Sequence, residues 1–207
     1  MNNLSILNCA QGTDEWNAAR CGIPTASQFD RIVTAGGKAS EQATDYLAEL
    51  LAEHVSGQKK SLPATADMQR GVELEPEART EYMKETWHEV QEVGGIYLDD
   101  TRKILCSPDG IMPGLKKGLE IKCPRMATHI KYLFDGGLPK KYALQVQGAL
   151  WITGYETWDF VSYCPEFKAQ PLFIYTARRN ETLIKALDKH VRAFSEKLEA
   201  LKEKYYG

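Results

Sequence analysis

The most constraining feature of this chain is a carboxylate and an ammonium that alternate with apolar residues in one short segment. Residues 118–124 read Gly-Leu-Glu-Ile-Lys-Cys-Pro, so Glu120 and Lys122 each lie between apolar neighbours. In a strand, side chains two positions apart point to the same face. Glu120 and Lys122 would therefore project side by side from one face, while the apolar side chains form the other.

A further acid lies in a turn before this segment. Residues 107–110 read Ser-Pro-Asp-Gly, which places Asp109 eleven positions before Glu120. Pro, Asp and Gly together favour a turn, and an apolar run at 104–106 precedes it. We expect 104–106 and 118–124 to be neighbouring strands of a hairpin, which would bring Asp109 next to Glu120.

Two carboxylates that converge on one point repel each other unless a cation or a proton lies between them. Oxygen ligands of this kind suit a hard ion such as Mg²⁺. With Lys122 beside the ion, the group suits hydrolysis of a phosphodiester, because a lysine can orient a hydroxide or neutralise a phosphate oxygen. The alternative is a surface hairpin whose Glu and Lys face water, since short matches to this pattern arise often by chance.

The length and charge of the chain limit its class. With 207 residues, 43% of them hydrophobic, we expect one domain over 1–207 with a sizeable core. The formal net charge is −2, so any contact with nucleic acid must use a local positive surface. Basic pairs at 59–60, 116–117, 140–141 and 178–179 are candidates for contacts with a DNA backbone, although solvated loop charge explains each pair equally well.

The five cysteines are widely spaced, form no Cys-x-x-Cys pair and are odd in number, which favours reduced thiols in a cytosolic protein. The start of the chain has no basic region followed by a long apolar stretch, and no segment approaches ~18 continuous apolar residues. We therefore expect neither secretion nor a membrane span.

Apolar spacing predicts helices at 14–19, from 25 onward, at 41–55, 66–86, 127–134 and 140–152, and in a long closing segment capped by Asn180. Strand-like runs lie at 88–93, 96–99, 104–106 and 119–123, while 157–164 and 170–176 alternate like an antiparallel pair. This order of elements implies an α+β fold in which helices flank a mixed sheet.

One predicted helix carries an acid, Glu75, on a partly apolar face with Met68 and Val72. An unpaired carboxylate is costly to desolvate, so a metal ion would be a suitable partner for Glu75. The alternative is an ordinary ion pair with Arg79, four positions further along. Pro76 should kink this helix or mark a local start.

Five blocks of the chain occur in the order that is typical of one family. They lie at 15–20 together with 22–27, at 71–79, at 106–110, at 118–124 and at 142–147. Each block alone is a weak signal, but together they resemble the lambda-exonuclease branch of the PD-(D/E)xK nucleases, also described as the YqaJ-type viral recombinase family. The resemblance implies a restriction-endonuclease-like core with a central mixed sheet flanked by helices.

The resemblance also implies roles for individual residues. Asp109 and Glu120 match metal-binding acids, with the carbonyl of Ile121 as a further ligand. Lys122 matches the catalytic lysine, and Glu75 matches the helix acid that contacts metal or metal-bound water. Two Mg²⁺ ions per site are implied, and Mn²⁺ is expected to substitute.

Two glutamines match the family's motif on the helix beside the site. We place Gln147 with the catalytic residues and Gln145 as a possible substrate contact. The alternative for both is the polar face of an amphipathic helix, and for Gln145 this alternative is nearly as good.

The N-terminal blocks contain groups that suit a phosphate. Arg20 can bind a phosphate with two N–H groups, Thr25 and Ser27 offer hydroxyls at a helix start, and Ser107 stands two residues before Asp109. The alternative for Ser27 is a plain N-cap. By resemblance, Arg20, Ser27 and Ser107 form a pocket for a 5′-phosphate, with Thr25 as a possible contact.

The resemblance implies a Mg²⁺-dependent 5′→3′ exonuclease, encoded by a phage or prophage and working in the bacterial cytoplasm. It would degrade one strand of 5′-phosphorylated duplex DNA to mononucleotides and leave a 3′ single strand for an annealing protein. A ring-shaped homotrimer is implied as well. The alternatives are an endonuclease on the same core, which would cut closed circular DNA, and a DNA-binding module without chemistry, which would not need the acids and the lysine together.

Overall fold

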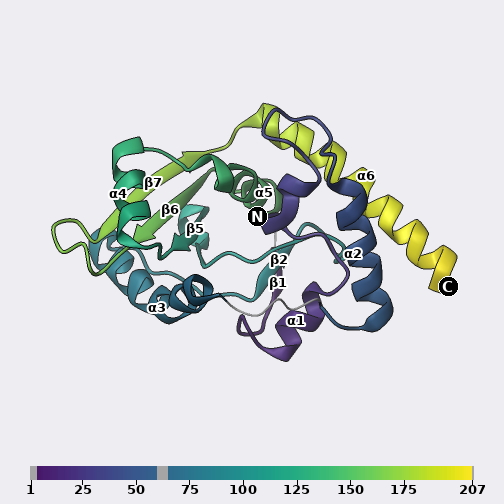
Figure 1. The fold of residues 1–207 in the computed structure, drawn as a ribbon, viewed down its shortest axis with the longest axis horizontal. Helices are drawn as coiled ribbons and strands as arrows, with labels where there is room; N and C mark the ends of the chain where they lie inside the picture. Colours follow the sequence, from purple (N-terminus) through teal and green to yellow (C-terminus); the bar gives the residue numbers. More distant parts are fainter. Residues whose placement is uncertain (1–3, 60–64, 207) are drawn as a thin grey trace.

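The structure, a computed structural model, describes residues 4–59 and 65–206. Its elements in chain order are β1 (Ser5–Leu7), α1 (Asp14–Arg20), the 3₁₀ helix η1 (Ala26–Arg31), α2 (Ala43–Ser56), α3 (Ala66–Thr86), β2 (Gly95–Tyr97), β3 (Leu105–Cys106), β4 (Gly110–Met112), η2 (Pro113–Leu115), β5 (Lys117–Lys122), α4 (Met126–Asp135), η3 (Lys140–Tyr142), α5 (Ala143–Thr153), β6 (Thr157–Tyr163), β7 (Leu172–Arg178) and α6 (Glu181–Tyr206). Figure 1 shows their arrangement.

The strands form two sheets. β1, β2 and β3 pair antiparallel in that order, and the second sheet has the order β4-β5-β6-β7. Within the second sheet β5 and β6 are parallel, whereas the other neighbours are antiparallel. A parallel pair needs a long crossover, which α4 and α5 supply between β5 and β6. The expected α+β fold with a mixed sheet is therefore confirmed, as is the antiparallel pair β6–β7.

Helices cover both faces of the second sheet (Figure 1). Leu119 and Ile121 of β5 belong to a buried cluster with Tyr82 of α3. Trp158 of β6 belongs to another cluster with Val146 of α5. The apolar face of β5 therefore packs against α3, and its charged face is turned to the side of α5.

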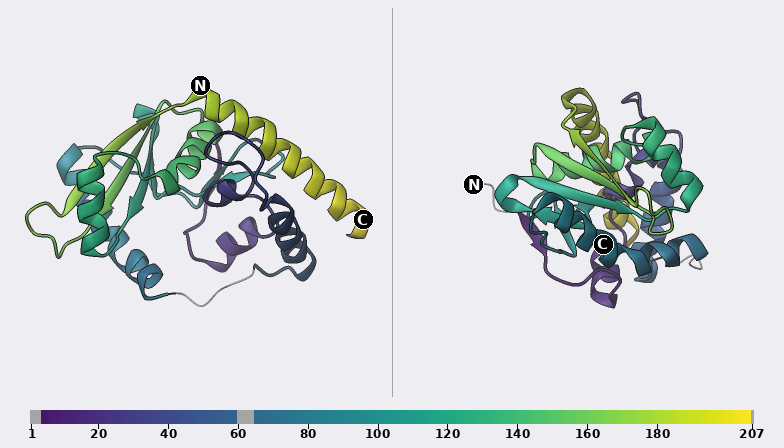
Figure 2. Two further views of the ribbon diagram at one scale, coloured as in Figure 1. Left: turned by 45° about the horizontal axis from the view of Figure 1, so that its top comes forward. Right: turned by 90° about the vertical axis from the view of Figure 1, so that its left-hand side faces the viewer.

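The long helix α6 lies beside α2 and runs past the rest of the chain to the C-terminus (Figures 1 and 2). The ring of Phe194 on α6 stacks on Tyr46 of α2, with 5.5 Å between the ring centroids. The predicted cap of this helix is present, since the side chain of Asn180 accepts a hydrogen bond from the N–H of Leu183 at 3.1 Å.

The expected hairpin between 104–106 and 118–124 is not formed. β3 pairs with β2 in the first sheet, and β5 pairs instead with β4, a strand that directly follows Asp109. The turn at 107–109 thus carries the chain from one sheet to the other. β1 and β4, of three residues each, were not predicted.

Residues 88–93 were expected to be a strand, but they form only one isolated bridge, between Gln91 and Ile111. The helix predicted at 66–86 has those limits, and it runs through Pro76 without interruption, so Pro76 marks no new start. Its first turns are not packed: Met68 is 57% and Val72 73% exposed. The two apolar residues expected to share a face with Glu75 are therefore exposed to solvent.

Within the described ranges, no helix is long and apolar enough to cross a membrane. All five cysteines lie in these ranges and are free. Cys106 and Cys123 are buried in the core, as expected for small apolar side chains.

Candidate active site

The pairing of β4 with β5 places Asp109 against the strand that carries Glu120. The backbone N–H of Asp109 donates to the carbonyl of Leu119 at 3.1 Å. Its carboxylate oxygen Oδ2 accepts a hydrogen bond from the N–H of Ile121 at 2.6 Å. The structure thus brings Asp109 and Glu120 together as predicted, although by a different strand pairing.

Glu120 is a buried carboxylate with two donors. Its side chain is 4% exposed, and its Oε1 lies 2.5 Å from Nζ of Lys122. The same oxygen accepts a hydrogen bond at 2.6 Å from Nε2 of Gln145 on α5. The Lys122 ammonium also lies 5.5 Å from the ring centroid of Tyr142. Glu120 and Lys122 therefore leave β5 on one face, as the alternation predicts.

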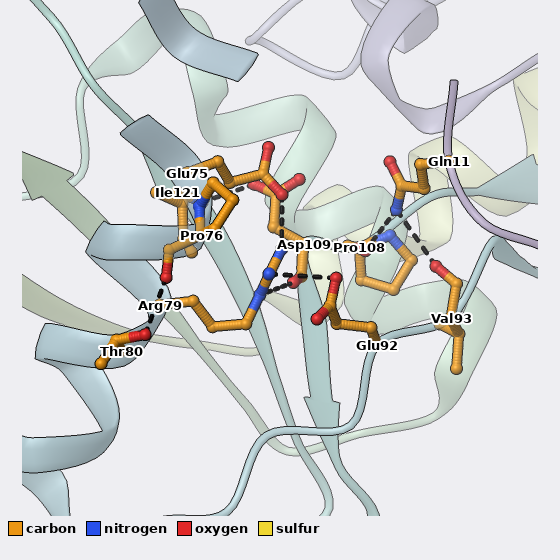
Figure 3. Close-up of polar contacts among 10 residues, drawn as sticks. All are labelled: Gln11, Glu75, Pro76, Arg79, Thr80, Glu92, Val93, Pro108, Asp109 and Ile121. Carbon is orange, nitrogen blue, oxygen red and sulfur yellow. Dashed lines mark hydrogen bonds and ion pairs between the residues drawn. The ribbon is translucent and has the colours of Figure 1, made fainter. Parts of the chain in front are cut away.

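Glu75 comes from α3 and is accompanied by Arg79. The Glu75 carboxylate accepts a hydrogen bond at 2.5 Å from Nη2 of Arg79, which is the ion pair of the alternative interpretation. Nε of Arg79 also donates to the backbone carbonyl of Asp109 at 3.0 Å. Figure 3 shows Glu75 and Asp109 both next to the Arg79 guanidinium. Glu75 therefore forms the ion pair with Arg79 and also lies beside Asp109 at the candidate site.

Burial and mutual repulsion raise the pKa values of the acids in this cluster. Burial, and then the charge of Asp109, raise the pKa of Glu75 to about 7 against the opposing effect of Arg79. Burial raises the pKa of Glu120 to about 7 despite the nearby Lys122 ammonium, and burial also raises the pKa of Asp109. Burial alone would lower the pKa of Lys122, but the carboxylates of Glu120 and Asp109 outweigh it and raise that pKa.

The raised pKa values of Glu75 and Glu120 mean that further positive charge near the three carboxylates would be favourable. No three His, Cys, Asp or Glu side chains of the described residues are already arranged as metal ligands. Each of the three carboxylates instead accepts hydrogen bonds from protein groups, and Glu75 and Glu120 also form ion pairs. An oxygen-only donor set of this charge is what Mg²⁺ requires, so the residues fit such an ion if the carboxylates change partners.

A cavity of about 150 Å³ lies beside Glu120 and Lys122 and extends to Arg20 and Ser107. Nη1 of Arg20 donates to the hydroxyl of Ser107 at 2.6 Å, and the guanidinium lies 4.2 Å from the ring centroid of Trp16. Arg20 is only 8% exposed. The structure thus brings Arg20 and Ser107 together beside the acids.

Two residues that line this cavity each have a buried N–H without a partner among the described residues, Nε of Arg20 and Nε1 of Trp158. Trp158 is fully buried on β6 against Gly118, where an added Cβ would come within 2.2 Å of the indole. An unpaired buried donor is costly, so these two N–H groups are candidates for a hydrogen bond to a bound ligand. Sequence analysis missed Trp158, because a strand tryptophan ordinarily indicates only core.

Ser27 lines the same cavity and is exposed. Thr25 is 3% exposed, and its hydroxyl lies 3.3 Å from that of Ser27. Thr25, rather than Ser27, is the N-cap residue of η1, and it makes no side-chain cap bond. Ser27 therefore remains a candidate phosphate contact, while Thr25 lies behind it.

Gln147 lies beside the junction of β7 and α6. It is buried on α5; its amide donates to the carbonyl of Arg178 at 2.8 Å and accepts from the N–H of Asn180 at 2.8 Å. These bonds hold the junction between β7 and α6. The hydrogen bonds of Gln147 thus go to main-chain groups rather than to the three acids, and its catalytic role stays a prediction. Gln145, two residues earlier on the helix, is the glutamine that contacts Glu120.

The basic pairs have different environments. Lys117 forms an ion pair at 2.9 Å with the buried Asp159, and Arg179 donates to two backbone carbonyls. These two cations hold the fold together. Lys141 is exposed and lines a cavity of about 530 Å³ that adjoins Glu75 and Lys122, whereas Lys60 lies outside the described residues.

An acid before one strand, Glu-x-Lys on the next and a further acid on a covering helix define a nuclease core of the PD-(D/E)xK class. Residues 15–156 match the model of the YqaJ-like viral recombinase domain. This match covers more than half of the chain, which therefore belongs to the YqaJ-like viral recombinase family.

Solved structures agree with this assignment. An alkaline exonuclease, LHK-Exo from Laribacter hongkongensis, is 36% identical, with a TM-score of 0.83 over 93% of this chain and 95% of that one. The same enzyme in complex with dAMP is 38% identical, with a TM-score of 0.82 over 93% and 97%. A phage related exonuclease from Haemophilus somnus 129PT shares the fold, with 16% identity and a TM-score of 0.65 over 88% and 96%. No curated protein matches the chain.

Proposed function

We propose that this protein is a divalent-cation-dependent exonuclease that degrades one strand of linear duplex DNA from its 5′ end to 5′-mononucleotides. The general class, a nuclease that acts on DNA, rests on the family and on the likeness to the alkaline exonuclease. The observation that carries the finer proposal is a cavity lined by Glu120, Lys122, Arg20 and Trp158. Arg20 and Trp158 each have a buried N–H that finds no partner among the described residues.

Asp109, Glu120 and the carbonyl of Ile121 would hold one Mg²⁺ ion, Glu75 would contribute to a second, and Mn²⁺ is expected to substitute. A bound divalent ion supplies a Lewis acid that polarises the phosphate and lowers the pKa of a water molecule. The protein's own contribution is orientation. Lys122, which lies beside the Glu120 carboxylate, orients the attacking water and offsets charge that develops on the phosphate.

The cavity also explains the proposed polarity. Arg20, Ser107 and Ser27 would bind a terminal 5′-phosphate, with the indole N–H of Trp158 as a further donor. Because this cavity adjoins Glu120, the bond that is cut would lie one nucleotide from the bound end. Binding of the end would then determine both the direction and the size of the product.

The proposed setting is a phage-type recombination system in the bacterial cytoplasm. The 3′ single strand left by digestion would be the substrate of a single-strand annealing protein. Exposed cations such as Lys141 would contact the DNA backbone, and a homotrimeric ring would keep the enzyme bound to the duplex between successive cleavages.

Digestion of end-labelled linear duplexes tests this function. We expect Mg²⁺-dependent release of mononucleotides from 5′ ends, faster with a 5′-phosphate than with a 5′-hydroxyl. Arg20→Gln should remove most of this preference, because the guanidinium is the cation that lies beside Ser107 in the proposed phosphate pocket.

Circular substrates decide between the alternatives. Cleavage of a covalently closed circle would show an endonuclease, and mononucleotide release from the 3′ end would overturn the polarity. Duplex binding without any cleavage in Mg²⁺ or Mn²⁺ would show a binding module.

A further inference from the structure

Arg79 on α3 is a buried cation at the site to which the proposed chemistry assigns no role. Its side chain is 9% exposed and bonds to three partners. Nε donates to the backbone carbonyl of Asp109 at 3.0 Å, Nη2 donates to Glu75 at 2.5 Å, and Nη1 lies 3.0 Å from a carboxylate oxygen of Glu92. Figure 3 shows the guanidinium between these groups.

The partners of Arg79 come from three separate segments. Glu75 belongs to α3, Asp109 immediately precedes β4, and Glu92 lies in the loop before β2. We propose that Arg79 is a positioning residue of the active site, whose guanidinium fixes the Glu75 carboxylate relative to the main chain of Asp109. This inference rests on the proposed function.

Hydrogen bonds from three segments fix the main chain at residues 108 and 109, and Arg79 donates the one that comes from α3. The N–H of Asp109 bonds to β5, and its carbonyl bonds to Arg79. The carbonyl before it, that of Pro108, accepts from the amide of Gln11, which also bonds to Val93 (Figure 3). Loss of Arg79 would leave the Asp109 carbonyl without this bond and free the Glu75 carboxylate to move, which displaces both acids relative to the substrate.

A planar guanidinium holds three partners in fixed directions, whereas the ammonium of a lysine is a point charge on a flexible chain. Arg79→Lys therefore retains the charge beside Glu75 but loses the fixed geometry. The comparison of Lys with Gln at this position separates an effect of geometry from an effect of charge.

Arg70 offers a matched control on the same helix. Its Nε donates to the carbonyl of Cys123 at 3.3 Å, and its two Nη atoms bond to the carboxylate of Glu166 at 2.6 Å. Arg70 thus joins α3 to other segments by the same kinds of bond, but it contacts none of the proposed catalytic acids.

The test measures kcat and the KM for a 5′-phosphorylated duplex at saturating Mg²⁺, well below the melting temperature of each variant. We expect Arg79→Gln and Arg79→Lys each to lower kcat by about 10- to 100-fold with KM within about twofold of wild type, the range seen when partners of active-site ligands are removed. Arg70→Gln should lower the melting temperature but keep kcat within about twofold.

Thermal unfolding in EDTA gives a second test. The effects of Arg79→Gln and Glu75→Gln on the free energy of unfolding should be non-additive, because the two side chains contact each other.

Three results would overturn the inference: a kcat for Arg79→Gln like that of Arg70→Gln, full recovery of kcat in Arg79→Lys, or a rise in KM with kcat unchanged. If Arg79→Gln does not fold, the kcat and KM of Arg79→Lys decide, because a kcat within about twofold of wild type in that variant would overturn the inference. A wild-type protein that cleaves no duplex would instead refute the proposed function, and the two failures are distinguishable because each variant is compared with wild type.

Discussion

At the scale of single residues, the site is a competition between burial and charge. Asp109, Glu75 and Glu120 lie in one group, in which Lys122 and Arg79 offset part of their negative charge. Burial is therefore the main cause of the raised pKa values of these carboxyl groups. Burial is also a common cause of strongly raised carboxyl pKa values at functional sites.

Asp109→Asn should abolish most cleavage while the fold and duplex binding persist. The asparagine oxygen can still accept the Ile121 N–H, and loss of one like charge relieves repulsion. We expect the rate to fall by about 10²- to 10³-fold or more, measured with labelled duplex in Mg²⁺. Asp100→Asn, an exposed acid outside the site, is the control, and near-normal cleavage by Asp109→Asn would refute the site.

The raised pKa values of Glu75 and Glu120 predict that, without metal, their contribution to stability falls as pH rises. Each group titrates at about 7 when folded and near about 4.3 when unfolded. The folded state therefore binds more protons between these values, so this contribution to the free energy of unfolding is lost as pH rises from about 4.3 through about 7.

Thermal unfolding in EDTA across this range measures the effect, and Glu75→Gln and Glu120→Gln should each flatten the slope. Mg²⁺ should stabilise the protein increasingly as pH rises toward and above 7, because its ligands must be deprotonated. A stability that rises with pH in wild type, with the same slope in both variants, would contradict this account.

At the scale of elements, β5 carries a lysine at each end with different surroundings. Lys117 pairs with the buried Asp159, whereas Lys122 lies between Glu120 and the cavity. The strand therefore separates a structural cation from a proposed catalytic one by five residues.

Lys122→Ala should lower kcat by about 10²- to 10³-fold with little change in duplex affinity, if its charge acts mainly in the transition state. Lys117→Ala should lower the free energy of unfolding by about 1–3 kcal/mol, because Asp159 loses a charged partner, and should leave kcat nearly unchanged. Steady-state kinetics and denaturant unfolding of both variants check this. An equal loss of affinity without a change in turnover would make Lys122 a binding residue.

Helix α5 provides a similar contrast between two glutamines. Gln145→Ala should reduce the rate of cleavage, because Glu120 loses the donor that orients it. Gln147→Ala should instead destabilise the fold by about 1–3 kcal/mol, since a backbone carbonyl and an N–H lose their partner. The same two measurements distinguish them, and the reverse outcome would support the catalytic role predicted for Gln147.

At the scale of the whole molecule, a chain of charge −2 has little general attraction for DNA. A closed ring with rotational symmetry would repeat each basic patch around a channel and hold duplex through modest contacts. The resemblance to the lambda-exonuclease branch implies that such a ring has three subunits, so we propose a homotrimer of roughly 70 kDa, three times the chain mass, and expect many nucleotides to be released per encounter. Sedimentation that shows only monomer at micromolar concentration, with DNA present, would exclude the ring but leave the site intact.

Much of this protein follows from local sequence, because local physics determines it. The alternation around Glu120 and Lys122 fixes which side chains share a face of β5, and the 3.6-residue spacing at 66–86 gives the limits of α3. The turn at 107–110 also predicted that Asp109 lies near Glu120, although the strand pairing that brings the two residues together is not the one expected.

Tertiary structure alone decided which strands pair and which groups the long side chains contact. β4 is too short to be seen in sequence, yet its pairing places Asp109. Gln145 and Gln147 are indistinguishable locally, and only the packing of α5 turns one toward Glu120 and the other toward the junction of β7 and α6. The three partners of Arg79 lie on segments that meet only when both sheets are assembled, because contacts between distant segments depend on the global fold rather than on local periodicity.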